Sequence, residues 1–205
     1  AGSAACACLA SRGVSVIGLE QFNIGHERGS SAHQSRAFRM AYAEHPGYVP
    51  LLKRARKLWL AIDEGVAKTV FHQSGGLYLS NGDSGFVPDS IAAAKAHDVP
   101  HDVLTAEQVR TRFPVFNIPD SFIGLHEPLA GFIVPEHAIE AHIAIARKHG
   151  ADLREGVQVL GWKETTNGIE VETSQGSVVG DSLLICKGAW TNEVPVRPSR
   201  QVLVW

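Results

Sequence analysis

Residues 2–20 read GSAACACLASRGVSVIGLE, and this stretch indicates the class of fold. Residues 3–12 are small and apolar, which favours a helix, and Gly13 supplies a glycine at the helix C-terminus. Residues 14–19 form a short apolar run of the kind found in buried parallel strands, and the run ends at Glu20. A helix followed at once by such a strand predicts an α/β fold.

The same stretch matches the second half of a dinucleotide-binding unit. Such a unit has a glycine-rich turn at a helix N-terminus, which receives the pyrophosphate, and an acid after the second strand, which binds ribose hydroxyls. Gly2 and Ser3 take the place of the last glycine and the first helical turn, and Glu20 follows at the expected separation of about 20 residues. Alone this half-motif is weak, because any helix followed by a strand ending in glutamate satisfies it.

Helical and strand-like patterns alternate along the rest of the chain. Helices are expected at 48–62, at 91–97, after a capping box formed by Thr105 and Gln108, and between Pro135 and Gly150. Strands are expected at 77–79, 153, 157–162, 169–173 and 177–185, with a hairpin turn at 166–168. The middle part, residues 75–130, interrupts an α/β sheet. Two interleaved domains are therefore expected.

Composition excludes several classes of protein. The 205 residues are 44% hydrophobic and 20% charged, as in globular proteins, and the formal net charge of −2 does not indicate a nucleic-acid partner. No apolar run approaches the roughly 18 residues of a membrane span. The three cysteines form neither a disulfide framework nor a set of metal ligands, so we expect reduced thiols, a cytoplasmic location and no metal site.

Residues 20–42 carry a more specific pattern, EQFNIGHERGSSAHQSRAFRMAY. This segment resembles the stretch after the second strand in the family of monomeric sarcosine oxidase, N-methyltryptophan oxidase and pipecolate oxidase, which are FAD-dependent amine oxidases. The resemblance continues in order through EHPGYVPLLKRARKLW, SGGLYLS, HEPLAGFIVPE, KGAWTNEV and RPSRQVLVW, so it covers essentially the whole chain.

The resemblance implies a Rossmann-like FAD-binding domain interleaved with a mixed α+β substrate domain. The FAD domain is expected at residues 1–73 and 131–196, and the substrate domain at 74–130 and, as a returning strand, at 197–205. The resemblance also implies truncation at both ends. The first strand with its two glycines would precede this chain, and the region that attaches FAD covalently would follow it.

A set of cofactor contacts is implied as well. Glu20 is expected at the adenosine ribose, residues 29–31 beside the flavin, Val159 beside the adenine, and the turn at 188–190 against the cofactor. The implied FAD-binding residues are Gly2, Ser3, Glu20, Gln21, Gly29, Ser30, Ser31, Arg36, Val159, Gly188 and Trp190.

Arg36, Arg39 and His33 are the implied catalytic residues. A cation stabilises the anionic reduced flavin, and a second, forked guanidinium can hold a substrate carboxylate through two hydrogen bonds. Spacing alone favours two solvated arginines, which share a face if the stretch is helical. The resemblance reverses that interpretation and gives Arg36 the flavin and Arg39 the carboxylate. The family's His-Gly pair stands here as Ala32-His33, so His33 either serves from a shifted position or is a loop residue.

Three functions stay open from the sequence. The resemblance implies FAD-dependent oxidation of N-methyl or cyclic secondary amino acids to an imine, with oxygen reduced to hydrogen peroxide, by a monomer whose partners are the amino acid and oxygen. A related flavin dehydrogenase or a glycine-oxidase-like enzyme is the second, and peroxide yield separates it from the first. A fragment that binds no flavin is the third, and flavin absorbance would exclude it.

Overall fold

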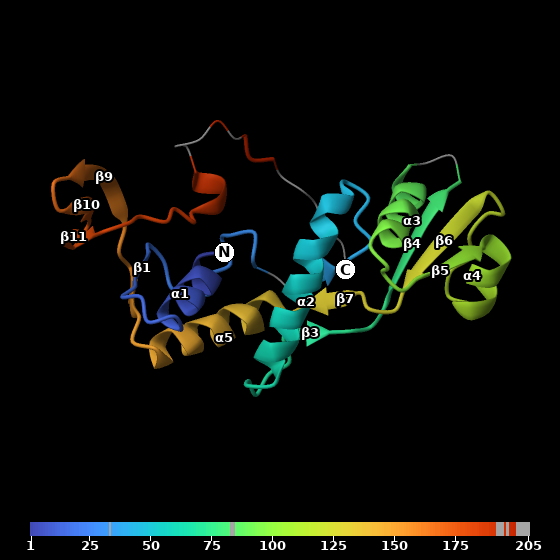
Figure 1. Ribbon diagram of the computed structural model, residues 1–205, viewed down its shortest axis with the longest axis horizontal. Coiled ribbons are helices and arrows are strands. Elements are labelled where there is room, and N and C mark those ends of the chain that lie inside the picture. Colours follow the sequence, from blue (N-terminus) through green and yellow to red (C-terminus); the bar gives the residue numbers. More distant parts are fainter. Residues whose placement is uncertain (33, 83–84, 192–194, 196, 200–205) are drawn as a thin grey trace. The chain divides into compact units, whose positions relative to one another are not determined.

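The computed structural model describes residues 1–32, 34–82, 85–191, 195 and 197–199. Its contacts divide the chain into two units, one of residues 1–33 and 135–205 and the other of residues 34–134. The chain therefore leaves the first unit, builds the second, and returns. Figure 1 shows the helices and strands of both units, with labels where there is room.

The opening helix and strand of the first unit form where the sequence predicts them, although both are shorter. Helix α1 (Gly2–Ala10) and strand β1 (Ile17–Glu20) are separated by a turn that contains Gly13 at φ 80°. β1 pairs in parallel with β8 (Asp152–Glu155), as expected for an α/β sheet. The strand is only partly buried: Ile17 is 42% exposed and the other three residues are half-buried, so the expectation of a buried strand is wrong.

Helix α5 (Pro135–Lys148) covers the same unit and packs against α1. The buried side chains of the two helices are mostly alanines, which allow close approach of the backbones. Pro135 begins α5 and Gly150, at φ 83°, follows its end, as predicted.

A three-stranded antiparallel meander completes the regular structure of the first unit. Its strands are β9 (Val159–Thr165), β10 (Gly168–Thr173) and β11 (Gly176–Gly180), and the predicted hairpin turn joins the first two. The expected strand over 177–185 is wrong beyond residue 180. Leu184 is 62% exposed there, because among the described residues no neighbouring strand pairs with this run. A short turn of 3-10 helix, η2 (Gly188–Trp190), follows.

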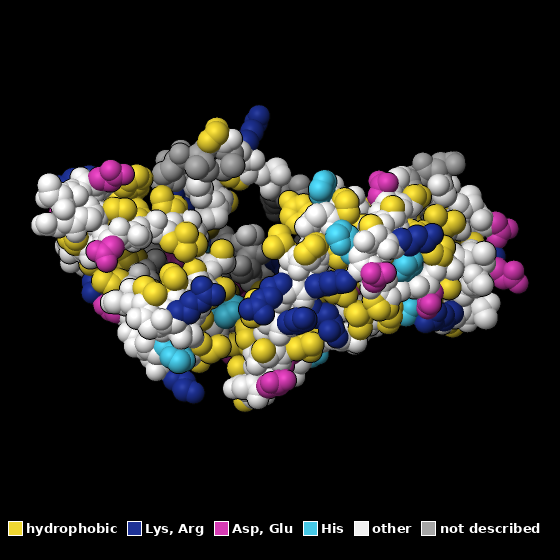
Figure 2. Space-filling view, in the orientation of Figure 1, with side chains coloured by type: hydrophobic (Ala, Val, Ile, Leu, Met, Phe, Trp, Pro, Cys, Tyr) yellow, Lys and Arg dark blue, Asp and Glu magenta, His cyan; other side chains and the backbone are white. Residues whose placement is uncertain are grey.

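The second unit starts with a small sheet built across a long sequence separation. Strands β2 (Arg36–Phe38) and β3 (Phe71–His72) both pair with β7 (Gly131–Ile133), in antiparallel fashion. Between β2 and β3 lie the 3-10 turn η1 (Pro46–Tyr48) and helix α2 (Val49–Asp63). The apolar side of α2 packs on the core of this unit, while Lys and Arg side chains gather over α2 in Figure 2.

The remaining sheet of this unit has the order β4-β6-β5, formed by β4 (Gly76–Asn81), β6 (Phe122–Glu127) and β5 (Asp102–Thr105). Residues of helix α3 (Phe86–Ala96) belong to the same hydrophobic core cluster as Leu125 of β6. The residue before it in β6, Gly124, lies against Val109 of helix α4 (Ala106–Arg112). Successive strand residues face opposite sides, so the two helices cover opposite faces. The predicted capping box of Thr105 and Gln108 is present at the start of α4.

The contacts place residues 34–73 with the middle segment, although the sequence assigned them to the cofactor domain. The reason is strand pairing, since β2 and β3 flank β7 and bury Phe38 and Phe71 in the core of the second unit. The expected returning strand at 197–205 has no regular structure at 197–199, and residues 200–205 lie outside the described part. No helix in the described ranges is long and apolar enough to cross a membrane.

Candidate functional site

Glu20 ends β1 with a carboxylate that is 34% exposed. Its Oε1 accepts a hydrogen bond from the Phe22 amide at 2.9 Å and lies 3.6 Å from Nε2 of His26. The Glu20 carbonyl accepts from the Val157 amide at 2.9 Å. The acid is thus oriented by its own loop while it stays accessible, which suits an acceptor for ribose hydroxyls. Gln21, the next residue, is exposed.

Aromatic contacts bring the turn at 188–190 to the end of β1. The centre of the Phe22 ring lies 5.0 Å from that of the His26 ring and 6.4 Å from that of the Trp190 ring. The Arg28 guanidinium lies 4.3 Å above the centre of the Phe22 ring. Gly188 adopts φ 55°, a conformation that favours glycine. Glu20 and the turn that carries Trp190 therefore belong to one region of the first unit.

The start of α1 lies in the same region. A Cβ placed on Gly18 would lie 3.1 Å from the Cys6 sulfur, so β1 passes beside the middle of α1. Gly2 lies one helical turn before Cys6, and a Cβ on Gly2 would lie 3.4 Å from that of Cys186. No described side chain caps the N-terminus of α1, which begins with Gly2 and Ser3. Helix amides at such an end suit a phosphate group.

Two further predicted contacts flank this region. Val159, at the start of β9, is 45% exposed and lies two residues beyond the Val157 amide that binds the Glu20 carbonyl. Gly29 lies beside His26, since a Cβ placed on Gly29 would be 3.6 Å from the imidazole. The Gly29 carbonyl accepts a hydrogen bond from the Ala32 amide. Ser30 and Ser31 are exposed in this turn. His33 lies outside the described residues.

Arg36 and Arg39 lie in the second unit, and the stretch that carries them is not helical. Arg36 begins strand β2, and Arg39 follows the last residue of that strand. The strand forms because it pairs with β7, and strand alternation does not put positions three apart on one face. The Arg36 guanidinium donates to the Ser35 carbonyl at 2.7 Å.

Arg39 has a defined setting. Its guanidinium lies 4.6 Å above the Tyr42 ring and 5.4 Å from the Phe86 ring, and its Nη2 donates to Oε1 of Glu44 at 2.7 Å. The side chain is 25% exposed, so it is accessible at one side and supported at the other. This guanidinium already binds one carboxylate oxygen, which is the chemistry expected of a carboxylate anchor.

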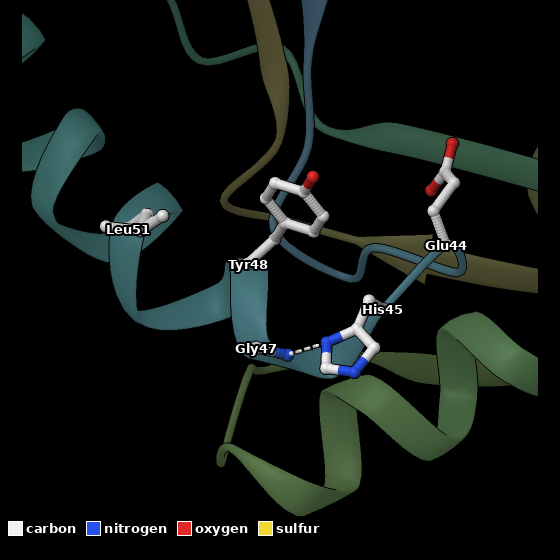
Figure 3. Close-up of a pocket in the computed structure, with 5 residues that line it drawn as sticks. All are labelled: Glu44, His45, Gly47, Tyr48 and Leu51. Carbon is white, nitrogen blue, oxygen red and sulfur yellow. Dashed lines mark hydrogen bonds between the residues drawn. The ribbon is translucent and has the colours of Figure 1, made fainter.

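A shallow hollow adjoins Arg39 at the start of α2. Figure 3 shows the residues that line it, Glu44, His45, Gly47, Tyr48 and Leu51, with the Gly47 amide donating to Nδ1 of His45 at 3.0 Å. Glu44 links the hollow to Arg39, and the Tyr48 ring lies 5.2 Å from the Tyr42 ring on which Arg39 stacks. Polar and aromatic groups thus surround the arginine.

Sequence reasoning missed a buried carboxylate near Arg39. Glu127, at the end of β6, is fully buried and accepts hydrogen bonds from the Met40 and Ala41 amides and from the Tyr78 hydroxyl. Burial and the nearby Glu127 charge raise the pKa of Tyr78 well above its ordinary value, so the phenol remains a proton donor. The one signal in the sequence was a glutamate that follows an apolar strand pattern immediately before the PLAG turn.

The described residues contain no candidate metal-binding site. Among these residues no group of three His, Cys, Asp or Glu side chains lies close enough to hold an ion. Cys6, Cys8 and Cys186 are unpaired thiols. In the first unit, the groups suited to bind a ligand are the N-terminus of α1, Glu20 and the turn at 188–190. In the second unit, the suited group is Arg39 with its aromatic neighbours.

Comparisons with known proteins show the family of this chain. The family model described as FAD dependent oxidoreductase (DAO) matches residues 1–204. Monomeric sarcosine oxidase of Streptomyces avermitilis is 37% identical over 100% of this chain and 55% of its own length. N-methyl-L-tryptophan oxidase of Salmonella dublin is 33% identical over 94% of this chain and 53% of its own length. This chain thus spans about half the length of these relatives.

A solved structure shares the fold. L-proline dehydrogenase from P. horikoshii superposes with a TM-score of 0.79 and 26% identity, covering 92% of this chain and 50% of the other. The first unit has an α/β arrangement in which the helix start, the acid and the aromatic turn suit a nucleotide. One family model matches nearly the whole length of this chain, which therefore belongs to the FAD dependent oxidoreductase (DAO) family.

Proposed function

We propose that the intact protein containing this chain oxidises N-methyl or cyclic secondary amino acids. The amino acid would lose a hydride from the carbon of its C–N bond, the resulting imine would be hydrolysed, and oxygen would be reduced to hydrogen peroxide. Bound FAD would supply the chemistry that accepts the hydride and passes electrons to oxygen. The names of the two relatives, sarcosine oxidase and N-methyl-L-tryptophan oxidase, support this class of substrate.

The first unit would hold the adenosine part of FAD. Glu20 would accept hydrogen bonds from ribose hydroxyls, with Gln21 beside it, and the α1 amides at Gly2 and Ser3 would face the pyrophosphate. The contacts of the Glu20 carbonyl with Val157 and of Phe22 with Trp190 support one continuous surface for this group. The other proposed contacts, beside the adenine or the flavin, are Val159, Gly29, Ser30, Ser31, Gly188 and Trp190.

The second unit would hold the substrate. The observation that carries the proposal is the setting of Arg39, whose guanidinium is supported by the Tyr42 and Phe86 rings and binds a carboxylate oxygen of Glu44. A forked guanidinium of this kind anchors an amino acid by its carboxylate. Arg36 would supply positive charge for the reduced cofactor, and His33 is proposed as a further imidazole of the active site.

The test has a cofactor readout and a product readout. Denaturing the purified intact protein, or digesting it if the flavin is covalently attached, should yield a flavin with the mass of FAD. Under air, oxidation of an N-methyl amino acid should form hydrogen peroxide in one-to-one ratio with imine-derived product. A nicotinamide in place of the flavin would end the proposal.

A related flavin dehydrogenase is the second candidate function. The likeness to L-proline dehydrogenase at 26% identity favours it, since a cyclic secondary amino acid is the substrate named there. The two functions share the proposed role of Arg39 and differ in the electron acceptor. Substrate oxidation that needs an artificial acceptor and forms no peroxide under air would select the dehydrogenase.

A further inference from the structure

Glu127 is a buried carboxyl group that accepts hydrogen bonds from three donors. Its side chain is fully buried at the end of β6, and its two oxygens together accept from two backbone amides and one phenol. The distances are 3.0 Å and 3.2 Å to the Met40 amide, 3.1 Å to the Ala41 amide and 2.6 Å to the Tyr78 hydroxyl. Burying a carboxylate is costly unless hydrogen bonds compensate for the lost water, so the buried Glu127 side chain depends on these three donors.

The two amides belong to the residues that immediately follow Arg39. Before Arg39, the ladder between β2 and β7 fixes the backbone as far as Phe38, which pairs with Gly131. After Arg39, the Glu127 carboxylate fixes the backbone at Met40 and Ala41, which are themselves buried. The chain is therefore held on both sides of a residue whose own side chain remains accessible.

Glu127 is itself held at two points. The Tyr78 hydroxyl donates to it from β4, and the register of β4 and β6 sets that distance. The Glu127 carbonyl accepts from the Ala130 amide in the turn that leads to β7, the strand that pairs with β2. The same turn thus joins the carboxylate to the strand ladder on the other side of Arg39.

We infer that Glu127, supported by Tyr78, is a positioning residue that fixes the backbone of Arg39 for binding of the substrate carboxylate. The inference rests on the proposed function of Arg39. Two parallel hydrogen bonds to a carboxylate require the guanidinium in a narrow range of positions, and a misplacement of about 1 Å can cost on the order of a hundredfold in rate. Glu127 contributes through the backbone and does not touch the substrate.

The experiment uses two mild variants of the intact protein and one matched control. Glu127→Gln keeps one acceptor oxygen and removes the second, and Tyr78→Phe removes only the phenol donor. Val109→Ala makes a cavity at a fully buried residue of α4 in the same unit, with no hydrogen bond to residues 39–41, and its thermal destabilisation serves as the reference. Each variant is assayed with an N-methyl amino acid and with the corresponding N-methylamine that lacks the carboxylate.

Glu127→Gln should raise KM for the carboxylated substrate by about tenfold, and Tyr78→Phe by about threefold, with little change for the amine lacking the carboxylate. Amide hydrogen exchange at residues 39–42 should speed up in both variants. Val109→Ala should lower the melting temperature without either effect. Exchange at these residues reports on the backbone whether or not the enzyme turns over.

Two outcomes would overturn the inference and can be told apart. If exchange at residues 39–42 is unchanged in Glu127→Gln, the carboxylate does not fix this backbone, whatever the substrate. If exchange speeds up but neither Glu127→Gln nor Arg39→Lys discriminates between the two amines, Arg39 does not bind the substrate carboxylate. In that case the proposed function of Arg39 fails, and the positioning role fails with it.

Discussion

The guanidinium of Arg39 binds a carboxylate oxygen of Glu44 while resting on the Tyr42 ring. Arg39→Lys would keep the charge and lose the fork, because an ammonium cannot form two parallel hydrogen bonds with one carboxylate. We expect KM for a carboxylated amine to rise about tenfold or more, and reduction of the flavin to slow, because the substrate loses its orientation. Stopped-flow measurement of flavin reduction against substrate concentration gives both quantities.

The control for that prediction is the neighbouring arginine. Arg36→Lys should affect carboxylated and uncarboxylated amines alike and should alter the flavin absorbance, because its proposed partner is the cofactor. Equal losses for both kinds of amine in Arg39→Lys would assign Arg39 to the cofactor as well.

Glu20 provides a second prediction at the scale of the residue. Its carboxylate is oriented by the Phe22 amide and is 34% exposed, so removing it should leave the fold intact and weaken FAD binding. Charge-assisted hydrogen bonds contribute about 1.5–3 kcal/mol, which corresponds to a loss of roughly ten- to a hundredfold in affinity for Glu20→Ala. Titration of the apoprotein with FAD, followed by flavin fluorescence, measures the dissociation constant.

Glu155 offers a matched control for Glu20. It ends the neighbouring parallel strand, and its carboxylate accepts from the Ile24 amide. Glu155→Ala should lower stability through loss of that contact and leave FAD affinity nearly unchanged. Equal affinities for Glu20→Ala and the unaltered protein would remove Glu20 from the cofactor site.

Single residues differ in how far the sequence can predict them. Glu20 and Arg39 stand at recognisable positions of a local pattern, whereas Glu127 acts on an amide 87 residues away. Glu44 and Tyr78 are equally ordinary in sequence; Glu44 lies five residues from Arg39, whereas Tyr78 reaches Glu127 across 49 residues. Local periodicity contains no information about such pairs, so the residues that support a site remain hidden until the fold is known.

At the scale of the element, helix α4 allows a quantitative test. The Thr105 hydroxyl accepts from the Gln108 amide, and the Gln108 side chain accepts from the Thr105 amide. Removing such a cap costs about 1 kcal/mol of stability, so Thr105→Ala should lower the free energy of unfolding by that amount. Urea denaturation followed by far-ultraviolet circular dichroism measures it.

Thr111 in the same helix is the comparison. Its hydroxyl bonds to the Glu107 carbonyl one turn earlier, an interaction that does not cap the helix. Because alanine has the higher helix propensity, Thr111→Ala should be neutral or slightly stabilising. A loss of stability in Thr111→Ala as large as in Thr105→Ala would mean that the capping box contributes little.

Elements with strong internal periodicity were predictable, and elements made by pairing were not. α2, α5 and the hairpin of β9 and β10 follow their own patterns of apolar residues, proline and glycine. β2 is only three residues long and exists because β7 lies beside it, so no local pattern indicated a strand there. Residues 183–185 show the reverse, an apolar run without strand pairing among the described residues.

At the scale of the whole molecule, the interleaving of two units could be predicted from the change of pattern along the chain. The residue at which the chain first passes from one unit to the other could not be predicted. That position depends on the pairing of β2 and β3 with β7 at the far end of the middle segment. Strand pairs of such separation set the unit boundary near residue 34 and leave no local mark in the sequence.

The division into units predicts where FAD would change the dynamics of the intact protein. The groups proposed to hold its adenosine part, at the start of α1, the end of β1 and the turn at 188–190, all belong to the first unit. A ligand present at a hundred times its dissociation constant suppresses opening of its binding region by about a hundredfold. Comparing amide hydrogen exchange of apoprotein and FAD-loaded protein should therefore show slowing of that order at residues 2–10, 17–22 and 186–190.

The sheet β4-β6-β5 and helix α4 provide the internal reference, since they contain none of the proposed FAD-binding residues. Their exchange should slow much less. Glu20→Ala, examined at the same FAD concentration, should lose most of the protection at residues 17–22, because less of the protein would be loaded. Protection confined to residues 34–134 would place the adenosine part of the cofactor on the second unit and contradict the assignment of Glu20.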